Sequence, residues 1–231
     1  MKHLHYFIIL LALSGFSLIT TSCRQQNIEF PERVNDIDGN SYRTVTIGKQ
    51  VWFAENLKTT HLNDGTPIVN LPGNNDWILT QEPAFCWYNN DFDSYGNTYG
   101  NLYNWYAVNT GKLSPEGWHI PTTDEWDMLV KYLGNGEFSG DILKEKGTAH
   151  WVYPNESALN SFGFTALPGG YRNGINDAGS FYGAGKHGLW WSSSQGNPTS
   201  SFGRRIDYNR SYMVTECFIK ELGFSVRCVK D

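Results

Sequence analysis

The sequence lacks an excess of positive charge. Its 231 residues carry 18 Lys and Arg against 23 Asp and Glu, a formal net charge of -5. A nucleic-acid partner calls for a basic face, so this balance argues against one. After the first thirty residues there is no run of like charge and no low-complexity tract, which confines any predicted disorder to the N-terminal end.

Catalytic and metal-binding motifs are also missing. The chain has no G-x-S-x-G nucleophile elbow, no P-loop lysine pattern, no H-x-x-x-H and no C-x-x-C. We therefore predict no catalytic residue and no zinc site. Residues 91–101 start like a calcium-binding EF-hand loop, but Tyr95 and Leu102 stand where oxygen ligands are needed. Two interpretations of this segment stay open: a looser calcium cage, or a turn-rich loop without a metal.

The N-terminus has the pattern of a targeting segment. Residues 6–19 are nearly all apolar and too short to span a bilayer comfortably. Small residues then lead into Cys23, as in a bacterial lipoprotein signal, although Thr20 stands where that signal usually has Leu. The alternative is ordinary signal cleavage that leaves Cys23 as a thiol. The predicted domains are a signal peptide over 1–22, a lipidated tether over 23–35 and one globular domain over 36–231.

Export would place the domain in an oxidising compartment, where disulfides persist. If Cys23 is lipidated, its acyl chains anchor the protein to a membrane, and Cys86, Cys217 and Cys228 remain. Three cysteines allow at most one internal bridge and leave one thiol over.

Aromatic residues and glycine are abundant, with 9 Trp, 13 Tyr and 24 Gly, a composition typical of short strands and tight turns. Alternating β-branched residues around Gly48 predict a hairpin over 42–53. Residues 102–108 fit a short helix and a strand equally well. Further strands are predicted over 189–193, 202–208, 212–218 and 223–229. The predicted fold class is α+β, an irregular and loop-rich domain with antiparallel strands and one main core helix.

The main helix is predicted at the end of the stretch GWHIPTTDEW, residues 117–126. Thr122 and Glu125 match a capping box, in which each side chain binds the other residue's backbone amide. We expect His119 to be packed and hydrogen-bonded, with a catalytic role as the lesser alternative. Gly134 is placed to end the helix. Its apolar stripe at i, i+3, i+4 and i+7 consists of Trp126, Leu129, Val130 and Leu133.

Two aromatic doublets are candidate ligand platforms. In Trp87-Tyr88 and Trp190-Trp191, strand geometry would turn one ring inward and one outward. An outward Trp beside Asn or Ser could stack on a sugar ring or a peptide, although most aromatic residues of such a chain must lie in the core. The candidate ligand-binding residues are Trp87, Asn89, Asn90, Asp91, Arg172, Asn173, Trp190 and Trp191.

A family resemblance is carried by six segments in order: VWFAENLKTT, YGNLYNWYAVN, GWHIPTTDEWDMLVKYLG, GFTALPGGYRN, GLWWSSS and GFSVRCVKD. Over about residues 36–231 the chain is similar to the Fibrobacter succinogenes major paralogous domain family, which occurs largely in exported proteins and lipoproteins of the Bacteroidetes and Fibrobacter lineages. The resemblance implies a disulfide between Cys86 and Cys228, with Cys217 left as a buried thiol. Such a bridge would add about 4–5 kcal/mol in the chain-entropy model.

A wider resemblance is to the formylglycine-generating-enzyme-like branch of the C-type-lectin-like fold, at the helix start 120–126 and the segment 223–227. It implies a core helix, irregular loops and antiparallel strands that bring the two chain ends together. Enzymes of that branch bind copper through a closely spaced cysteine pair, whereas ten residues separate Cys217 from Cys228. Sugar-binding lectins of the fold carry acid-Pro-Asn and Trp-Asn-Asp motifs around calcium, and residues 153–155 and 190–192 lack them.

Together these features favour a non-catalytic, lipid-anchored envelope protein whose lectin-like domain binds a glycan or a protein. The alternatives are a cysteine- or metal-dependent enzyme of the formylglycine-generating type and a structural subunit of a cell-surface assembly. No cofactor is expected, apart from the calcium alternative. The expected location is the outer membrane. Because Arg24 and neutral residues follow Cys23, where surface-export tags tend to be acidic, the periplasmic and the surface-exposed side both stay open.

Overall fold

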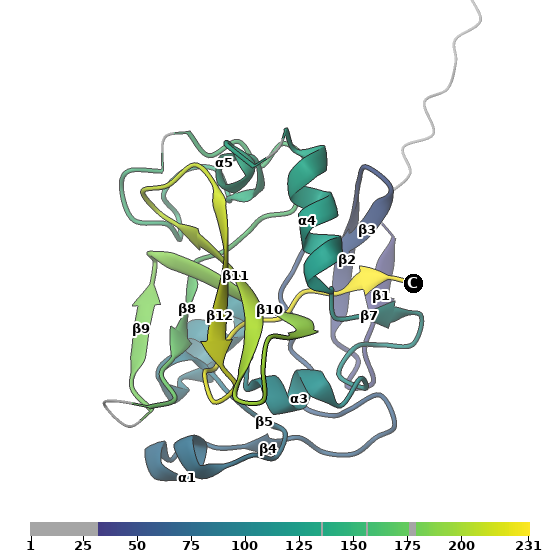
Figure 1. Cartoon of the computed structure of the whole chain (residues 1–231), viewed down its shortest axis with the longest axis vertical. Helices are drawn as coiled ribbons and strands as arrows, with labels where there is room; N and C mark the ends of the chain where they lie inside the picture. Colours follow the sequence, from purple (N-terminus) through teal and green to yellow (C-terminus); the bar gives the residue numbers. More distant parts are fainter. Residues whose placement is uncertain (1–31, 135, 156, 176–178) are drawn as a thin grey trace, which may run out of the picture. The chain divides into compact units, whose positions relative to one another are not determined.

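The alternating residues around Gly48 fold as predicted. Strands β2 (Ser41–Ile47) and β3 (Gln50–Phe53) pair antiparallel, and Gly48 turns the chain with a φ of 64°, where glycine has no Cβ penalty. The computed structural model of the protein describes residues 32–134, 136–155, 157–175 and 179–231 (Figure 1). The predicted signal peptide, Cys23 and most of the predicted tether lie outside the described residues.

The other elements are mostly short. The helical segments are α1 (Asn74–Leu79), η1 (Tyr88–Asn90), η2 (Phe92–Gly96), α2 (Asn97–Tyr99), α3 (Trp105–Asn109), α4 (Thr123–Tyr132) and α5 (Ser139–Leu143). The strands are β1 (Arg33–Asn35), β4 (Val69–Asn70), β5 (Ala84–Cys86), β6 (Leu102–Tyr103), β7 (Trp118–His119), β8 (Gly169–Arg172), β9 (Phe181–Ala184), β10 (His187–Gln195), β11 (Ser200–Asp207), β12 (Met213–Ile219) and β13 (Val229–Lys230).

These strands form four small sheets, ordered β1-β2-β3-β13-β7, β10-β11-β12, β4-β5-β6 and β8-β9. All pairs are antiparallel except β4 with β5. The C-terminal strand β13 pairs with β3 on one side and β7 on the other, so the C-terminus closes the sheet that the hairpin begins (Figure 1). The combination of a few helices with mainly antiparallel sheets confirms the α+β class.

Helix α4 has the predicted cap and the predicted buried face. The Thr122 side chain accepts from the Glu125 amide, the Glu125 side chain accepts from the Thr122 amide, and both halves of the capping box are present. Trp126 and Leu129 are completely buried. Gly134 follows the helix end with a φ of 99°, as expected of a glycine just past a helix C-terminus.

Three segments differ from the predictions. Residues 102–108 are neither one helix nor one strand, because β6 ends at Tyr103 and α3 begins at Trp105. The predicted strand 223–229 is mostly a set of single bridges to β8, β6 and β10, since this segment passes between several elements, and only β13 at its end pairs within a sheet. Residues 33–35, expected in the tether, form β1 and pair with β2.

Trp190 and Trp191 are both buried, so the prediction that one of these two rings faces solvent is wrong. Both indoles are 0 % exposed. They do alternate along β10, but each face of the strand meets a different hydrophobic cluster: Trp191 packs with Phe224, and Trp190 lies in the cluster of Trp126. The ring nitrogens donate to Tyr103 O and to Asn56 Oδ1, as buried indoles require. Neither residue can contact a ligand at the surface.

The predicted disulfide is wrong. Cys86, Cys217 and Cys228 are all free thiols. Cys86 packs in a small cluster with Trp77 and Leu102, while Cys228 lies in the main cluster that contains Trp191, so the two sulfur atoms are embedded in separate parts of the core. Cys217 is exposed on β12 and not buried as expected. Among the described residues, no helix combines the length and the hydropathy needed to cross a bilayer.

Candidate functional site

A tight turn between β1 and β2 begins the candidate site. Asp36 is buried at its start, and its Oδ1 accepts from the amides of Asp38 and Asn40 at 3.0 and 2.9 Å. Its Oδ2 accepts from Asn40 Nδ2 at 2.9 Å and from the Tyr42 hydroxyl at 2.5 Å. Gly39 supplies the positive φ of 82° that this turn requires. Because four donors surround the Asp36 carboxylate, the turn has one well-defined conformation.

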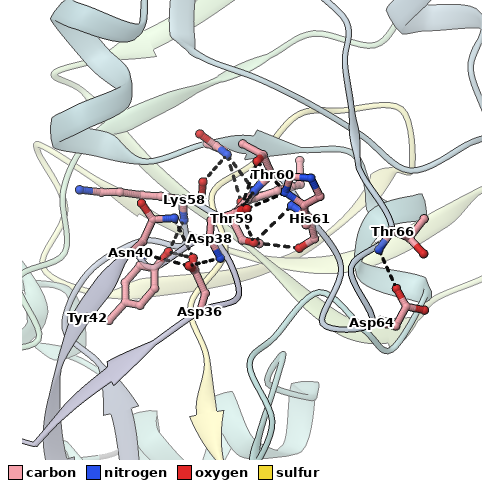
Figure 2. Close-up of polar contacts among 12 residues, drawn as sticks. Asp36, Asp38, Asn40, Tyr42, Lys58, Thr59, Thr60, His61, Asp64 and Thr66 are labelled. Carbon is pink, nitrogen blue, oxygen red and sulfur yellow. Dashed lines mark hydrogen bonds and ion pairs between the residues drawn. The ribbon is translucent and has the colours of Figure 1, made fainter.

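Asp38 ties this turn to the segment that follows β3. Its Oδ2 accepts from the Thr59 hydroxyl at 2.9 Å and from the Thr60 amide at 2.5 Å, and its Oδ1 lies 2.5 Å from His61 Nδ1. Figure 2 shows the two aspartates side by side, with Asp38 turned toward residues 59–61. Burial by itself would raise the pKa of Asp38, but these hydrogen bonds hold it below its ordinary value. The carboxylate is therefore charged and fully engaged.

The same segment is held from its other side. Asn101 Nδ2 donates to Lys58 O and to Thr59 O at 2.9 and 3.0 Å, and the Tyr103 hydroxyl donates to Thr59 O at 2.6 Å. Lys58 Nζ reaches across to Asn97 O at 2.8 Å. Residues far apart in the sequence are thus fixed against one another by bonds to backbone carbonyls, which leaves little freedom in the walls of the site.

Two aromatic rings complete a cavity of about 300 Å³ over this cluster. Trp87 and Phe92 pack edge to face with centroids 5.2 Å apart, and Phe92 is 46 % exposed. The cavity, called here the Trp87 cavity, is lined by Asp38, Asn40, Lys58, Thr60, Trp87, Phe92, Asn97 and Asn101. It combines an apolar wall with side-chain amides and a hydroxyl, in the size range of a small-ligand site.

Of the predicted ligand-binding residues, Trp87 is the one that lines this cavity. Asn89 and Asn90 are exposed and do not line the cavity, and their φ angles of 54° and 57° are left-handed, a conformation that Asn tolerates in turns. The Asp91 side chain accepts from the Ser94 amide at 2.9 Å and so caps the next turn. That hydrogen bond lowers the pKa of Asp91.

Arg172 is not a ligand contact, which corrects that prediction. Its side chain is 0 % exposed and donates to Gly179 O, Leu71 O and Pro72 O. The guanidinium also lies 4.6 Å from the centroid of the Trp77 ring. It therefore joins two loops from within, the one before α1 and the one that contains Gly179. Asn173 is half-buried and lines a different cavity from Trp87.

The groups around His61 and His119 do not suit a Ser-His-Asp-like relay. Asp38 and the Thr60 hydroxyl both approach the same nitrogen of His61, Nδ1, whereas a relay needs the acid and the hydroxyl on opposite nitrogens. His119 has a carboxylate at each nitrogen: Asp231 at 2.6 Å from Nδ1 and Glu125 at 2.7 Å from Nε2. The expectation that His119 is hydrogen-bonded within the structure is confirmed.

No group of three or more His, Cys, Asp or Glu side chains in the described part of the chain is arranged to hold a metal ion. The looser calcium cage over 91–101 stays a prediction.

Sequence reasoning missed most of the cavity. The turn at Asp38-Gly39 is visible as a turn signal, but nothing in the sequence shows that Lys58, Thr60 and Asn97 converge on it. The local signal in the sequence is an Asp- and Asn-rich turn over 36–40, directly before β2. Polar residues 58–60 follow soon after β3, which forms the hairpin with β2.

The comparisons agree with the segments that carried the family resemblance. The model of one protein family, the Fibrobacter succinogenes major domain, matches residues 45–230. This range contains β3, α4, β10 and β13, and so most of both hydrophobic clusters. No curated protein and no solved structure matches the chain.

Proposed function

The chain belongs to the Fibrobacter succinogenes major domain family, and we propose that it is a non-catalytic, lipid-anchored protein of the bacterial cell envelope that binds carbohydrate in the Trp87 cavity. The acylated residue is Cys23, and the domain has a C-type-lectin-like fold. The observation that carries the proposal is the pairing of two aromatic rings with fixed amide and hydroxyl groups around one cavity.

Sugars match this cavity because they have both apolar and polar faces. The C–H face of a pyranose packs against an aromatic ring, here Phe92, which is half exposed beside Trp87. Hydroxyl groups both donate and accept, and so do the side-chain amides of Asn40 and Asn97, which line the cavity. Fixed walls lower the entropy cost of binding.

The charges in the cavity favour a neutral ligand. Asp38 already accepts from residues 59–61, and the Lys58 ammonium already donates to Asn97 O. Asp38 would have to give up a bond of about 2.5–2.9 Å to bind a cationic ligand, and its negative charge and the positive charge of Lys58 offset each other in the cavity lining. Neutral hexose-containing glycans are therefore the expected class.

A glycan array probed with the purified full-length chain tests this proposal, followed by calorimetry with the best neutral oligosaccharide. Phe92→Ala should weaken binding at least tenfold, because the exposed ring provides the packing face. Phe138→Ala removes an aromatic ring that is 57 % exposed and does not line the cavity, so it should leave binding unchanged. Silence across the array, or equal losses in both variants, would contradict the proposal.

The anchor has a separate test. Metabolic labelling with a clickable palmitate should tag the wild-type chain and not the Cys23→Ser variant. Protease shaving of intact cells would then separate surface display from the periplasmic side. An unlabelled wild-type chain would refute acylation of Cys23 without affecting the carbohydrate proposal.

A further inference from the structure

A second cavity of about 370 Å³ lies against the sheet β10-β11-β12 and shares no lining residue with the Trp87 cavity. Its walls are mainly apolar, and Leu189 and Phe224 on its floor belong to the main hydrophobic cluster. Such walls around a few polar groups are typical of small-molecule sites. We call it the β12 groove; it is lined by Tyr171, Asn173, Ile175, His187, Leu189, Arg205, Cys217, Phe218, Ile219, Leu222 and Phe224.

The strand register gives this groove a long axis. On β11, Phe202 pairs with Cys217 and Arg205 pairs with Val214. Phe202 and Arg205 are three residues apart, roughly 10 Å at 3.3 Å per residue. His187 pairs with Asp207, two residues beyond Arg205. The groove therefore runs along the strands, with His187 and Arg205 toward one end and residues 217–219 toward the other.

One end of the groove carries the guanidinium of Arg205. His187 and Arg205 line the groove, and among the described residues no Asp or Glu does. The neighbouring carboxylates are engaged: Asp207 lies 2.7 Å from His187 Nδ1 and 3.2 Å from Arg205 Nε, and Glu216 accepts from Arg205 Nη1 at 3.0 Å. Burial would raise the pKa of Asp207, but the His187 hydrogen bond and the charge of Arg205 hold it below its ordinary value.

Arg205 keeps donors that nothing in the described structure uses. A guanidinium has five N–H groups. Its Nε is buried without a hydrogen-bond partner, because the 3.2 Å approach to Asp207 is not aligned for one, and its Nη2 donates to none of the described residues. Because Nε is buried and Nη1 is bonded to Glu216, Nη2 is the donor that a carboxylate in the groove would use.

We propose that the β12 groove binds a linear, apolar molecule that ends in a carboxylate. The carboxylate pairs with Arg205, and the apolar chain extends along β12 toward Phe218 and Leu222. The carboxylate accepts from the unused Nη2 donors of Arg205, while the chain fills the apolar part of the groove and excludes water from it. This site is independent of the carbohydrate proposal.

Calorimetry on the full chain in lipid nanodiscs, corrected with empty discs, tests the chemistry. The probes are hexanoate, hexan-1-ol with the same chain and no carboxylate, and acetate with the carboxylate and no chain. Hexanoate should bind at least tenfold more tightly than either of the others, since a hydrogen bond to a charged group and the burial of the chain both contribute. Equal binding of hexan-1-ol, or no binding of hexanoate, would overturn the proposal.

Two pairs of variants locate the site. Arg205→Gln should weaken hexanoate binding about tenfold and leave hexan-1-ol unchanged. Arg210→Gln is its control, because Arg210 also approaches Asp207, at 3.4 Å, but does not line the groove. Ile175→Asp adds a negative charge to the groove at a side chain that is 56 % exposed, and Val69→Asp adds one elsewhere at a residue that is 53 % exposed. If Arg210→Gln lost as much hexanoate affinity as Arg205→Gln, or Val69→Asp as much as Ile175→Asp, the assignment to this groove would be wrong.

Discussion

Glu125 Oε1 lies 2.7 Å from His119 Nε2, while Oε2 of the same carboxylate accepts from the Thr122 amide at 2.8 Å. One side chain thus closes the helix cap and holds the histidine that precedes it. Asp231, the last residue, binds the other nitrogen of His119 at 2.6 Å. The start of α4 and the C-terminus are consequently joined through one imidazole.

This arrangement predicts a pH-dependent contribution to stability. Burial lowers the pKa of His119, but the bonds with Asp231 and Glu125 raise it above the ordinary value of 6.5. A raised pKa means that the contribution is fully present below 6.5 and is lost as the pH rises through the folded-state value. For Glu125 burial raises the pKa, but bonds from Thr122 and His119 hold it below 4.5, so its contribution is lost only in stronger acid.

We therefore expect His119→Gln to destabilise the protein most near about pH 5.5 and least near about pH 8. The largest difference should not exceed about 1 kcal/mol, because the ring is 37 % exposed and Asp231 is 59 % exposed. Urea unfolding of both proteins across this pH range measures it. A difference that grew with rising pH would contradict the assigned sign.

Tyr42 offers a test of the rigid turn beside the Trp87 cavity. Its hydroxyl donates to Asp36 Oδ2 at 2.5 Å and accepts from the Lys58 amide at 2.9 Å. Burial raises the pKa of this phenol, so it stays protonated. Tyr42→Phe removes one hydrogen bond from Asp36 Oδ2 and one from the Lys58 amide, and should lower the free energy of unfolding by about 1–3 kcal/mol. Tyr132→Phe, at a residue 56 % exposed, is the matched control and should change the free energy of unfolding by less than about 0.5 kcal/mol.

Arg227 is expected to be much harder to replace than an exposed arginine. It is completely buried, and burial lowers its pKa to about 9. Its guanidinium donates to Asn56 Oδ1 and to three backbone carbonyls at 2.7–2.9 Å. Arg227→Met would leave these acceptors buried without donors and should cost more than about 3 kcal/mol. Equilibrium unfolding would show this, and a loss as small as that of the exposed Arg33→Met would refute it.

The cysteines should differ sharply in reactivity. Cys217 is exposed, whereas burial raises the pKa of Cys86 to about 12 and also raises that of Cys228. Iodoacetamide at about pH 8 should label Cys217 in the native protein and the other two only after unfolding, because the thiolate is the reacting species. Peptide mass spectrometry measures each site. A Cys86–Cys228 linked peptide in an unreduced digest would show the free-thiol arrangement to be wrong.

Local patterns predicted local structure well. The capping box before α4 and the turn at Gly48 act between residues at most a few positions apart, so sequence spacing specifies them. The three strands of the sheet β10-β11-β12 were also found, with ends displaced by up to a few residues. Where a strand begins and ends depends on how far the neighbouring strand pairs with it. The strand's own sequence does not show that neighbour.

The candidate site was largely hidden from the same reasoning. Trp87 lines the cavity, whereas Arg172 and Trp190 resemble ligand contacts equally well in the sequence and are buried. Arg172 is buried because three carbonyl groups from two loops converge on it. The polar lining of the Trp87 cavity comes from three stretches, 38–40, 58–60 and 97–101, whose meeting is a property of the folded chain.

The sequence by itself determined the family, the α+β class, the helix with its cap and the hairpin over 42–53, because each rests on nearby residues or on ordered motifs. Only the tertiary structure decided which aromatic rings face solvent, which cysteines stay apart and where the cavities lie. For the aromatic rings the reason is that β10 has a hydrophobic cluster on each face, with Trp191 in one and Trp190 in the other. Alternation along a strand says which side a ring is on, and only packing says whether that side is covered.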